Sequence, residues 1–528
     1  MAARRMGHPT HLLMALTWDH PPAPTRPCGH NYPLNTYDRV DLAARTDGST
    51  PVSAVHLSDA ARIKDHCGLF AVFGHLRAAE LAYLGIYAQQ HRGQESGGIC
   101  SLQDGRILRH AGLGLVTQIF DRDSLAALEG DAAIGHVRYS TTGSCHEVNS
   151  QPLLVNCAHG QVAVAHNGNL INAAELRNAN EARGAIFQTS SDTEVILHLL
   201  ANPGFADGPD PLAGVLRELR GAYCLLFMFP DRIEAARDPY GLRPLCVGRL
   251  DTGAHVIASE TCALDLVDAE YVREVRPGEI VTLSAEGLSS RMFVAPDEVQ
   301  PAHCIFEQVY FSDPSSNVFE QNVHSFRVAC GRELAAEAPV DADLLIPVPN
   351  CARCAAIGYS EASGLPLGRG FTTSHYMGRS FIMPTQSERD LVVRMKLNVI
   401  REAVRGKRLV VVEDSVVRGT TTRGKMGALR KAGAKEIHLR VASPPIRHPC
   451  YFGIDFPNPG KLIARTRSVE EIREYLEVDS LAYLSLEGML RSARHAPGDY
   501  CTACFSGTYP MTVDNPTSKL GLEKVPLL

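Results

Sequence analysis

Two stretches of this chain carry side chains that could do chemistry, and they suit different kinds of reaction. In the first, Asp65-His66-Cys67-Gly68-Leu69-Phe70, a cysteine opens a strand-like apolar run. The second runs from Leu409 to Thr421, where apolar residues lead into Glu413-Asp414 and then into a loop rich in Ser, Gly and Thr. A nucleophile and a phosphate-binding loop in one chain indicate two coupled half-reactions.

Cys67 could act as a nucleophile if another group takes its proton, because a free thiol is mostly protonated at neutral pH. A mature chain that began at Cys67 would supply its own α-amino group as that base, with an ordinary pKa near ~8. The alternative is a buried strand cysteine, and the isolated residue favours this alternative.

Polar, glycine-flanked segments downstream strengthen the case for chemistry. Arg138 follows a short strand, and the segment around Asn167 and Gly168 offers a side-chain amide and a backbone N–H for an oxyanion. Asp192 stands where a helix N-cap is predicted. An Arg and an Asp could hold the two ends of an α-amino acid, the Arg binding its carboxylate. Each segment alone could equally be a capped turn or a surface ion pair.

The second stretch, from Leu409 to Thr421, is typical of a strand whose carboxyl end binds a ligand. Glu413 and Asp414 could face ribose hydroxyls and a metal ion, and the following loop could bind a monophosphate at a helix N-terminus. In α/β sheets, ligands bind beyond the carboxyl ends of the strands. The alternative is an ordinary strand-to-helix loop. The candidate loop residues are Ser415, Arg418, Gly419, Thr420 and Thr421.

The elements that must position these residues change in character near residue 300. From Cys67 to about Pro296, short β-like runs separated by Gly and Asn turns alternate with a few helical patterns, which predicts an α+β layout with antiparallel sheets. From about Gln300 onward, nearly continuous apolar strands alternate with helix-length segments. This pattern is typical of a parallel sheet buried on both faces.

Composition narrows the class of protein. The 528 residues allow two to four domains, and a net charge of −6 argues against a nucleic-acid partner. No apolar run approaches the ~18 residues that a membrane span needs. Fifteen cysteines in so long a chain do not indicate a secreted disulfide framework. We therefore expect a cytoplasmic protein with neither nucleic-acid nor membrane partners.

Together these segments resemble the amidophosphoribosyltransferases, which are also called glutamine phosphoribosylpyrophosphate amidotransferases. The resemblance implies an N-terminal-nucleophile glutaminase domain, an αββα sandwich, over residues 67–297. An α/β type I phosphoribosyltransferase domain with a parallel sheet would follow over 298–490, and a C-terminal segment with ligand cysteines over 491–528. Residues 1–66 would be a leader or propeptide that is disordered or removed, and a leader of this length departs from the family.

The resemblance assigns roles in the glutamine half. Cys67 would attack the glutamine amide, Arg138 and Asp192 would hold the glutamine backbone, and Asn167 and Gly168 would stabilise the oxyanion. The reaction implied is glutamine, phosphoribosyl diphosphate and water giving phosphoribosylamine, diphosphate and glutamate. This is the first committed step of purine (IMP) synthesis, with ammonia channelled between two active sites.

In the acceptor half, Arg379 would lie in a loop that closes over the substrate and Lys396 would contact diphosphate. Asn350-Cys351-Ala352 stands where the family usually has Asp-Ser-Gly, and Glu413 stands where it usually has Asp. We expect activity to be retained with altered affinity. The Mg²⁺ ligands would be Cys351, Glu413 and Asp414, with Cys351 the weakest assignment.

Cys501-Thr502-Ala503-Cys504 is a CxxC pair that alone could be redox-active, zinc-binding or accidental. The resemblance is to a branch that binds a [4Fe–4S] cluster, with the ligands Cys304, Cys450, Cys501 and Cys504. Zinc with four thiolates would satisfy the same count. Cys351-Ala352-Arg353-Cys354 is a second CxxC that matches no ligand position.

The family also implies a homotetramer inhibited by purine nucleotides. Two other functions compete with this interpretation. One is a different amidotransferase of the same nucleophile class, such as a sugar-phosphate transaminase, which would lack the motif from Glu413 to Thr422. The other is a non-catalytic phosphoribosyl-diphosphate sensor, which would need neither Cys67 nor Arg138 and would usually carry a basic DNA-binding module.

Overall fold

The computed structural model describes residues 67–139, 146–158, 160–373, 397–454, 456, 459–513 and 522. Residues 1–66, where a leader is predicted, and the predicted loop residues Arg379 and Lys396 lie outside these ranges. The domain boundaries at 297/298 and 490/491 remain predictions. Within the described ranges, no helix combines the length and apolar character needed to cross a membrane.

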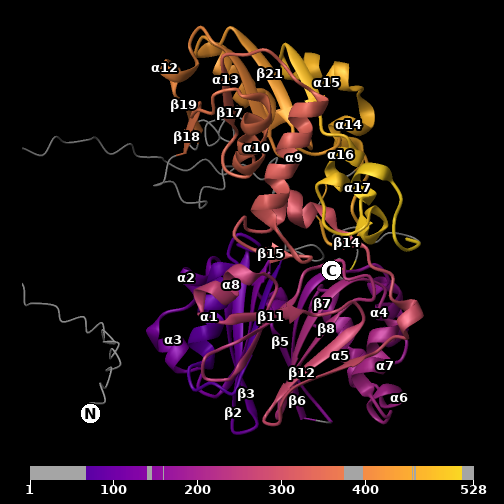
Figure 1. Ribbon diagram of the computed structural model, residues 1–528. Coiled ribbons are helices and arrows are strands. Elements are labelled where there is room, and N and C mark those ends of the chain that lie inside the picture. The colour runs from indigo at the N-terminus through magenta and orange to yellow at the C-terminus, as the bar shows by residue number, and fades with distance from the viewer. Residues whose placement is uncertain are drawn as a thin grey trace, which may run out of the picture. The chain divides into compact units, whose positions relative to one another are not determined.

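The first half of the described chain is built on two antiparallel sheets with helices on their outer faces (Figure 1). The first sheet has seven strands in the order β11-β9-β10-β1-β4-β2-β3. Helices α1 (Ala78–Ala88) and α8 (Thr261–Leu266) pack on it. Its strands are β1 (Gly68–Phe73), β2 (Ser96–Gln103), β3 (Arg106–Leu113), β4 (Ala132–Arg138), β9 (Cys246–Arg249), β10 (His255–Ala258) and β11 (Glu270–Glu274).

The second sheet has six strands in the order β13-β12-β8-β7-β6-β5. Helices α4 (Ala173–Glu181), α5 (Thr193–Leu200) and α7 (Pro211–Glu218) pack on its outer face. Its strands are β5 (Leu153–Cys157), β6 (Gly160–Leu170), β7 (Gly221–Met228), β8 (Arg232–Arg237), β12 (Glu279–Ser284) and β13 (Gly287–Met292). Short helices α2 (Val116–Ile119), α3 (Arg122–Ala126) and α6 (Pro203–Ala206) join these elements.

A buried apolar core between the two sheets holds the sandwich together. Leu69 and Ile134 of the first sheet and Ala165 and Leu226 of the second belong to one fully buried cluster. Side chains of a strand alternate between its two faces, so each sheet also presents a second apolar face to its own helices. The predicted αββα sandwich with antiparallel sheets is confirmed.

The second half contains a four-stranded parallel sheet in the order β17-β20-β21-β22. Residues Leu409 to Val412 of β20 are fully buried, which is why this strand reads as an unbroken apolar run. The predicted parallel sheet is confirmed. The strands are β17 (Leu344–Pro347), β20 (Arg408–Glu413), β21 (Glu436–Val441) and β22 (Ser480–Tyr483), and the longer helices are α9 (Val323–Glu337), α10 (Arg353–Ser363), α13 (Thr420–Lys431) and α15 (Val469–Leu476).

Shorter elements complete this half. They include a π-helix, η3 (Glu307–Phe311), and a two-stranded parallel pair formed by β14 (His303–Cys304) and β23 (Tyr500–Cys501). The other described elements are β15 (Asn317–Val318), β16 (Gln321–Asn322), β18 (Phe371–Thr373), β19 (Leu397–Val399), α12 (Arg401–Val404), α14 (Ile463–Thr466), α16 (Leu486–Arg491) and α17 (Ala503–Ser506), with the 3-10 helices η4 (Pro459–Lys461) and η5 (Pro497–Asp499).

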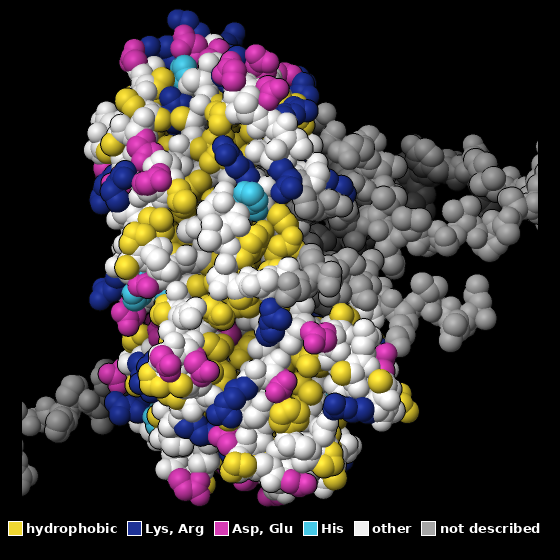
Figure 2. Space-filling model, turned by 90° about the vertical axis from the view of Figure 1, so that its right-hand side faces the viewer, with side chains coloured by type: hydrophobic (Ala, Val, Ile, Leu, Met, Phe, Trp, Pro, Cys, Tyr) yellow, Lys and Arg dark blue, Asp and Glu magenta, His cyan; other side chains and the backbone are white. Residues whose placement is uncertain are grey.

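Charges of both signs are interspersed on the face drawn in Figure 2, with hydrophobic side chains between them. This distribution agrees with the small net charge of −6.

Candidate active sites

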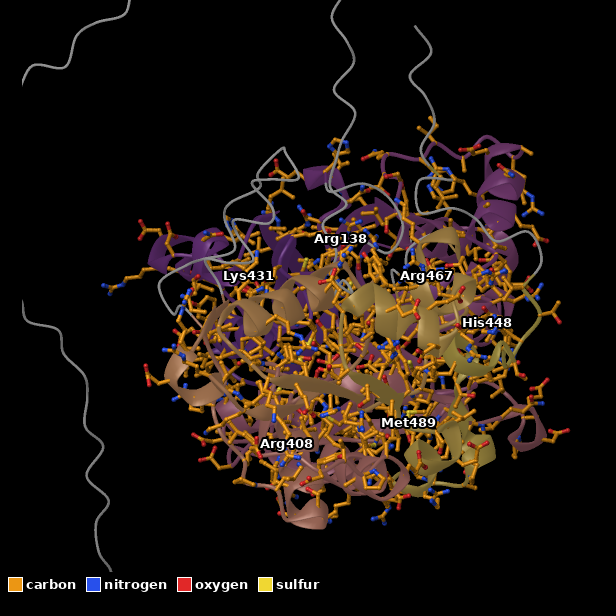
Figure 3. All side chains as sticks on the ribbon, turned by 90° about the horizontal axis from the view of Figure 1, so that it is seen from above. Arg138, Arg408, Lys431, His448, Arg467 and Met489 are labelled. Atoms are coloured by element: carbon orange, nitrogen blue, oxygen red, sulfur yellow. The ribbon has the colours of Figure 1, made fainter. Side chains whose placement is uncertain are left out.

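A small pocket gathers four of the predicted glutamine-site residues, Cys67, Arg138, Gly168 and Asp192. They come from the start of β1, the end of β4, strand β6 and the N-terminus of α5. Arg138 is labelled in Figure 3. The residues that complete the lining are Tyr139, Gln151, His166 and Ser191.

The Cys67 thiol is buried and donates a hydrogen bond of 3.5 Å to the carbonyl oxygen of Tyr139. Burial raises the pKa of this thiol to about 11, and the Tyr139 contact and the Arg138 charge offset only part of that shift. The thiol is therefore protonated at neutral pH, and its use as a nucleophile requires a base.

Asp192 and Arg138 bring opposite charges to the walls of the same pocket. Burial alone would raise the pKa of Asp192, but His166, with Nδ1 at 3.7 Å from the carboxylate, and the Leu170 backbone N–H at 3.0 Å hold that pKa below its ordinary value. An ionised carboxylate and a guanidinium suit the ammonium and carboxylate ends of an α-amino acid.

Asn167 is fully buried in β6, and neither its amide nitrogen nor its amide oxygen has a hydrogen-bond partner among the described residues. A buried amide without a partner is costly unless a ligand completes it. At Gly168 an added Cβ would lie 1.9 Å from the Ala222 carbonyl oxygen, so only glycine fits there. The unpaired side-chain amide of Asn167 and the close backbone approach at Gly168 are consistent with the predicted oxyanion site.

Sequence reasoning missed part of this pocket. Gln151 lies in a segment that carried no motif, yet its Oε1 accepts from the His166 backbone N–H at 2.7 Å and its Nε2 donates to Thr193 Oγ1 at 2.9 Å. Tyr139 and His166 are sequence neighbours of the predicted residues Arg138 and Asn167, so the polar segments that contain them could have indicated both. Gln151 offered no local signal, because its contacts form only when β6 and α5 pack together.

The predicted acceptor motif lies at the carboxyl end of β20. The strand ends at Glu413, and α13 begins after Gly419, which has φ +76° and acts as its N-cap. Ser415 Oγ donates to Asp414 Oδ1 at 2.6 Å, and Ser443 Oγ donates to the Asp414 carbonyl oxygen at 2.8 Å. The loop thus places Arg418, Thr420 and Thr421 around a helix N-terminus, which suits an anion.

A second small pocket joins Asp414 and Cys351 with Arg327 of α9. Burial raises the pKa of Asp414, against the Ser415 hydrogen bond and the Lys425 charge. Unlike Asp414, Glu413 does not line this pocket. Its two carboxylate oxygens lie 3.1 and 3.2 Å from Lys425 Nζ of α13. The structure therefore brings two of the three predicted Mg²⁺ ligands to one pocket and pairs the third with a lysine that sequence reasoning missed.

The four predicted cluster cysteines come together from three distant segments. Cys304 and Cys501 lie opposite each other in the β14–β23 pair. The Arg447 and His448 backbone N–H groups donate to the Cys504 carbonyl oxygen at 2.9 and 3.0 Å, which ties the segment before Cys450 to α17. The full set is Cys304, Cys450, Cys501 and Cys504.

The electrostatics agree with this proximity. Burial raises the pKa of Cys501, and the neighbouring Cys304 and Cys450 raise it further. Burial likewise raises the pKa of Cys304 to about 11, and the Arg243 charge opposes the shift. Cys354 lies elsewhere, in α10, with its Sγ 3.3 Å from His324 Nδ1.

Comparison with known proteins decides the family. A profile of the glutamine amidotransferase domain matches residues 136–266. An amidophosphoribosyltransferase of Synechococcus elongatus is 44% identical over 473 residues, which is 88% of this chain and 95% of the relative. One of Bacillus subtilis is 44% identical over 462 residues, 87% of this chain and 96% of the relative. The chain belongs to the amidophosphoribosyltransferase family.

Solved structures agree with the family. The glutamine phosphoribosylpyrophosphate amidotransferase from B. subtilis complexed with ADP and GMP superposes with a TM-score of 0.81 at 43% identity and covers 87% of this chain and all of that one. A structure described as the allosteric regulatory enzyme of purine biosynthesis gives a TM-score of 0.82 at the same identity and coverage. The chain thus shares the fold of these two structures across both of its sheet systems.

Proposed function

We propose that this chain is the glutamine-dependent amidophosphoribosyltransferase that makes phosphoribosylamine, diphosphate and glutamate from phosphoribosyl diphosphate, glutamine and water. One observation carries the proposal: a pocket lined by Cys67, Arg138 and Asp192 and a strand that ends at Glu413-Asp414 occur in one chain of the amidophosphoribosyltransferase family. The product would be the first committed intermediate of purine synthesis.

In the glutamine half, the Cys67 thiolate attacks the amide carbon of glutamine, and the carbonyl π electrons move onto oxygen. The Asn167 amide and the Gly168 N–H would donate to that oxyanion, while Arg138 and Asp192 hold the amino-acid end. The base then gives the thiol proton to the amide nitrogen, the C–N bond breaks, and neutral ammonia leaves. Water hydrolyses the remaining thioester to glutamate and frees the Cys67 thiol. The base would be the α-amino group of Cys67 after removal of residues 1–66.

In the acceptor half, the ammonia lone pair attacks C1 of the ribose as the C1–O bond to diphosphate breaks. Backbone amides and hydroxyls between Ser415 and Thr421 would hold the 5′-phosphate, and Asp414 would face the ribose and the metal. Mg²⁺ would offset the charge of the leaving diphosphate. Carboxylates of Glu413 and Asp414 suit Mg²⁺, whereas the Cys351 thiol is the ligand least suited to it.

The route of ammonia and the assembly of the protein are further parts of the proposal. Ammonia would pass inside the protein from the Cys67 pocket to the Asp414 pocket, with Arg379 and Lys396 acting at the acceptor end. A relative is named as a complex with ADP and GMP, which supports purine nucleotides as inhibitors. A homotetramer in the cytoplasm remains an expectation from the family.

We also infer that Cys304, Cys450, Cys501 and Cys504 bind a [4Fe–4S] cluster. A four-thiolate zinc site would place its sulfur atoms about 3.8 Å apart, because each Zn–S bond is about 2.3 Å long. Among the described residues, the one group of three candidate ligand atoms within 4.8 Å of one another belongs to His91, Glu260 and Cys262. No three of the four cysteine sulfurs are within that distance of one another, so they do not form the compact set that zinc would need.

Iron content tests the cluster. Anaerobically purified Cys501→Ser should lose most of its iron and its brown absorbance, because one iron of the cluster would lack its thiolate ligand. Cys354→Ser, in the CxxC pair that matches no ligand position, should keep both. Full iron in Cys501→Ser, or zinc in place of iron in the parent protein, would remove the cluster from the proposal.

The activity itself is tested by glutamate release from glutamine, with and without phosphoribosyl diphosphate and Mg²⁺. Strong stimulation by the second substrate is the expected result. Release without stimulation would leave a glutaminase with another acceptor. No release, with Cys67 confirmed as the mature N-terminus, would overturn the proposal in favour of a phosphoribosyl-diphosphate sensor.

A further inference from the structure

A fully buried glutamate, Glu307, lies between the two candidate sites, and neither proposed half-reaction uses it. It begins the π-helix η3 (Glu307–Phe311). Its Oε1 accepts from Arg92 Nη2 at 2.8 Å and from Arg243 Nη1 at 3.0 Å, and its Oε2 accepts from Ser312 Oγ at 3.1 Å. π-helical turns are rare and occur often at functional sites.

The first branch of this network leads to the nucleophile. Arg92 is 1% exposed, and its Nε donates to the carbonyl oxygen of Cys67 at 2.9 Å. The same guanidinium pairs with Glu260. Glu307 thus helps to fix the guanidinium that holds the backbone of Cys67, and the position of that backbone sets where the thiol lies relative to Arg138 and Asp192.

The second branch leads to the acceptor pocket. Besides the Ser312 hydroxyl contact, the Ser312 backbone N–H donates to the Glu307 carbonyl oxygen at 3.0 Å. Arg327 of α9 donates to the Gln308 and Ser312 carbonyl oxygens, both at 2.8 Å, and holds this turn. Arg327 also lines the pocket that contains Asp414 and Cys351.

The third branch leads to the cysteine group. Arg243 Nη2 donates to the Phe452 carbonyl oxygen at 2.6 Å, and the Phe452 N–H lies 3.4 Å from Cys450 Sγ. Two buried arginines therefore share the single carboxylate of Glu307. Ion pairs in such a dry environment are strong and sensitive to geometry, because little water screens them.

We propose that Glu307 is a positioning residue for Cys67, and that the turn Glu307–Ser312 couples the acceptor pocket to the glutamine pocket. The inference rests on the proposed function. When a substrate in the acceptor pocket moves Arg327, the turn Glu307–Ser312 moves with it and changes the contact between Glu307 and Arg92. The Cys67 carbonyl group, which accepts a hydrogen bond from Arg92, then shifts as well.

Glu307→Gln tests the positioning role, because it keeps the size of the side chain and removes its charge. In the full-length protein we expect glutamine-dependent kcat/KM to fall roughly tenfold to a hundredfold and stimulation by phosphoribosyl diphosphate to weaken. Activity with added ammonia should stay near the parental value, because it bypasses Cys67. The matched control is Glu279→Gln, a buried carboxylate that binds Arg273 and Arg276 and lines neither pocket.

Ser312→Ala tests the coupling branch alone and serves if Glu307→Gln fails to fold. It removes the contact to Glu307 Oε2, so basal glutamate release should persist while stimulation decreases. Equal losses of glutamine- and ammonia-dependent activity in Glu307→Gln, or parental stimulation in Ser312→Ala, would overturn the inference. A parent protein that shows no stimulation would instead contradict the proposed function.

Discussion

At the scale of single residues, each candidate site has a cation beside a functional side chain. Arg138 lines the pocket of the Cys67 thiol, and Lys425 Nζ lies 3.1 Å from Glu413 Oε1. The pKa of Cys67 is nevertheless raised to about 11 by burial, so the Arg138 charge does not produce a thiolate at neutral pH. The proton must go to a base, and the proposed chemistry assigns that role to an α-amino group.

Replacement of the nucleophile should separate the two half-reactions. In Cys67→Ala, glutamine-dependent activity should fall roughly a thousandfold or more, whereas ammonia-dependent activity should stay within about twofold, because only the first site loses a reacting atom. Both rates are measured as product formed from phosphoribosyl diphosphate. Loss of the ammonia-dependent rate in a folded protein would contradict the assignment of Cys67 to the glutamine half.

Lys425 should control the metal dependence of the acceptor half. Its ammonium group donates hydrogen bonds to both carboxylate oxygens of Glu413, which is mostly buried. The lysine therefore competes with Mg²⁺ for these oxygens. In Lys425→Met, the Mg²⁺ concentration that gives half-maximal activity should fall roughly threefold to tenfold, which corresponds to about 0.7–1.4 kcal/mol.

The control for this prediction is Lys431→Met, at the last turn of the same helix, where the lysine is exposed and labelled in Figure 3. Its Mg²⁺ dependence should match the parent protein. An unchanged or higher half-maximal concentration in Lys425→Met would show that the lysine assists the metal rather than competes with it.

At the scale of elements, α9 and α10 pack backbone against backbone. A Cβ added at Gly331 would lie 1.9 Å from the Ala355 carbonyl oxygen, and one added at Gly358 would lie 1.9 Å from the Val328 carbonyl oxygen. These contacts are too short for any side chain, so the pair of glycines sets the distance between the helices. Arg327 lies on α9, and Cys351 lies in the loop before α10. The distance between the two helices therefore also sets how far apart these two residues lie in the acceptor pocket.

Gly358→Ala should therefore lower the free energy of unfolding by about 1–3 kcal/mol, because the helices must separate to admit a methyl group. Gly427→Ala in α13 is the matched control, since an added Cβ meets no atom within 4 Å there. It should be neutral or stabilising by up to about 1 kcal/mol, as expected for Gly to Ala inside a helix. Urea unfolding of both variants measures the difference, and equal effects would contradict the close-packing explanation.

At the scale of the whole molecule, buried histidines make the stability depend on pH. Burial lowers the pKa of His136 and of His303 to about 3, and the Arg138 and Arg237 charges contribute respectively to the two shifts. The ordinary pKa of histidine is about 6.5, so between these values the unfolded chain binds protons that the folded protein does not. The contribution of these two histidines to the free energy of unfolding is therefore fully present above pH 6.5 and is lost as the pH falls toward 3.

The expected loss is about 1.4 kcal/mol per pH unit for each of the two histidines below pH 6.5. Urea unfolding at pH 7 and at pH 5.5 measures it, a window above the range in which most carboxylates titrate. His303→Gln should reduce the slope of stability against pH by about 1.4 kcal/mol per pH unit, because the contribution of that histidine is gone. A flat profile between these pH values would contradict the burial of neutral histidines.

The sequence by itself determined the features that are local along the chain. Glu413, Asp414 and the loop to Thr421 are contiguous, so a strand followed by acids and a helix N-terminus could be recognised without packing. The unbroken apolar run of β20 likewise predicted a doubly buried parallel strand. Asp192 was recognised as a helix N-cap, and Cys67 by the strand that follows it.

Only the tertiary structure decided which of these residues meet and what lies between them. Arg92 contacts Glu260 and Glu307, partners 168 and 215 positions away, and Gln151 joins the glutamine pocket from a segment without a motif. Lys425 and Glu413 are close in sequence, but their ion pair depends on how α13 lies against β20. The physical reason is that local pattern fixes the type and the face of an element, whereas contacts between distant side chains follow from the way the elements pack.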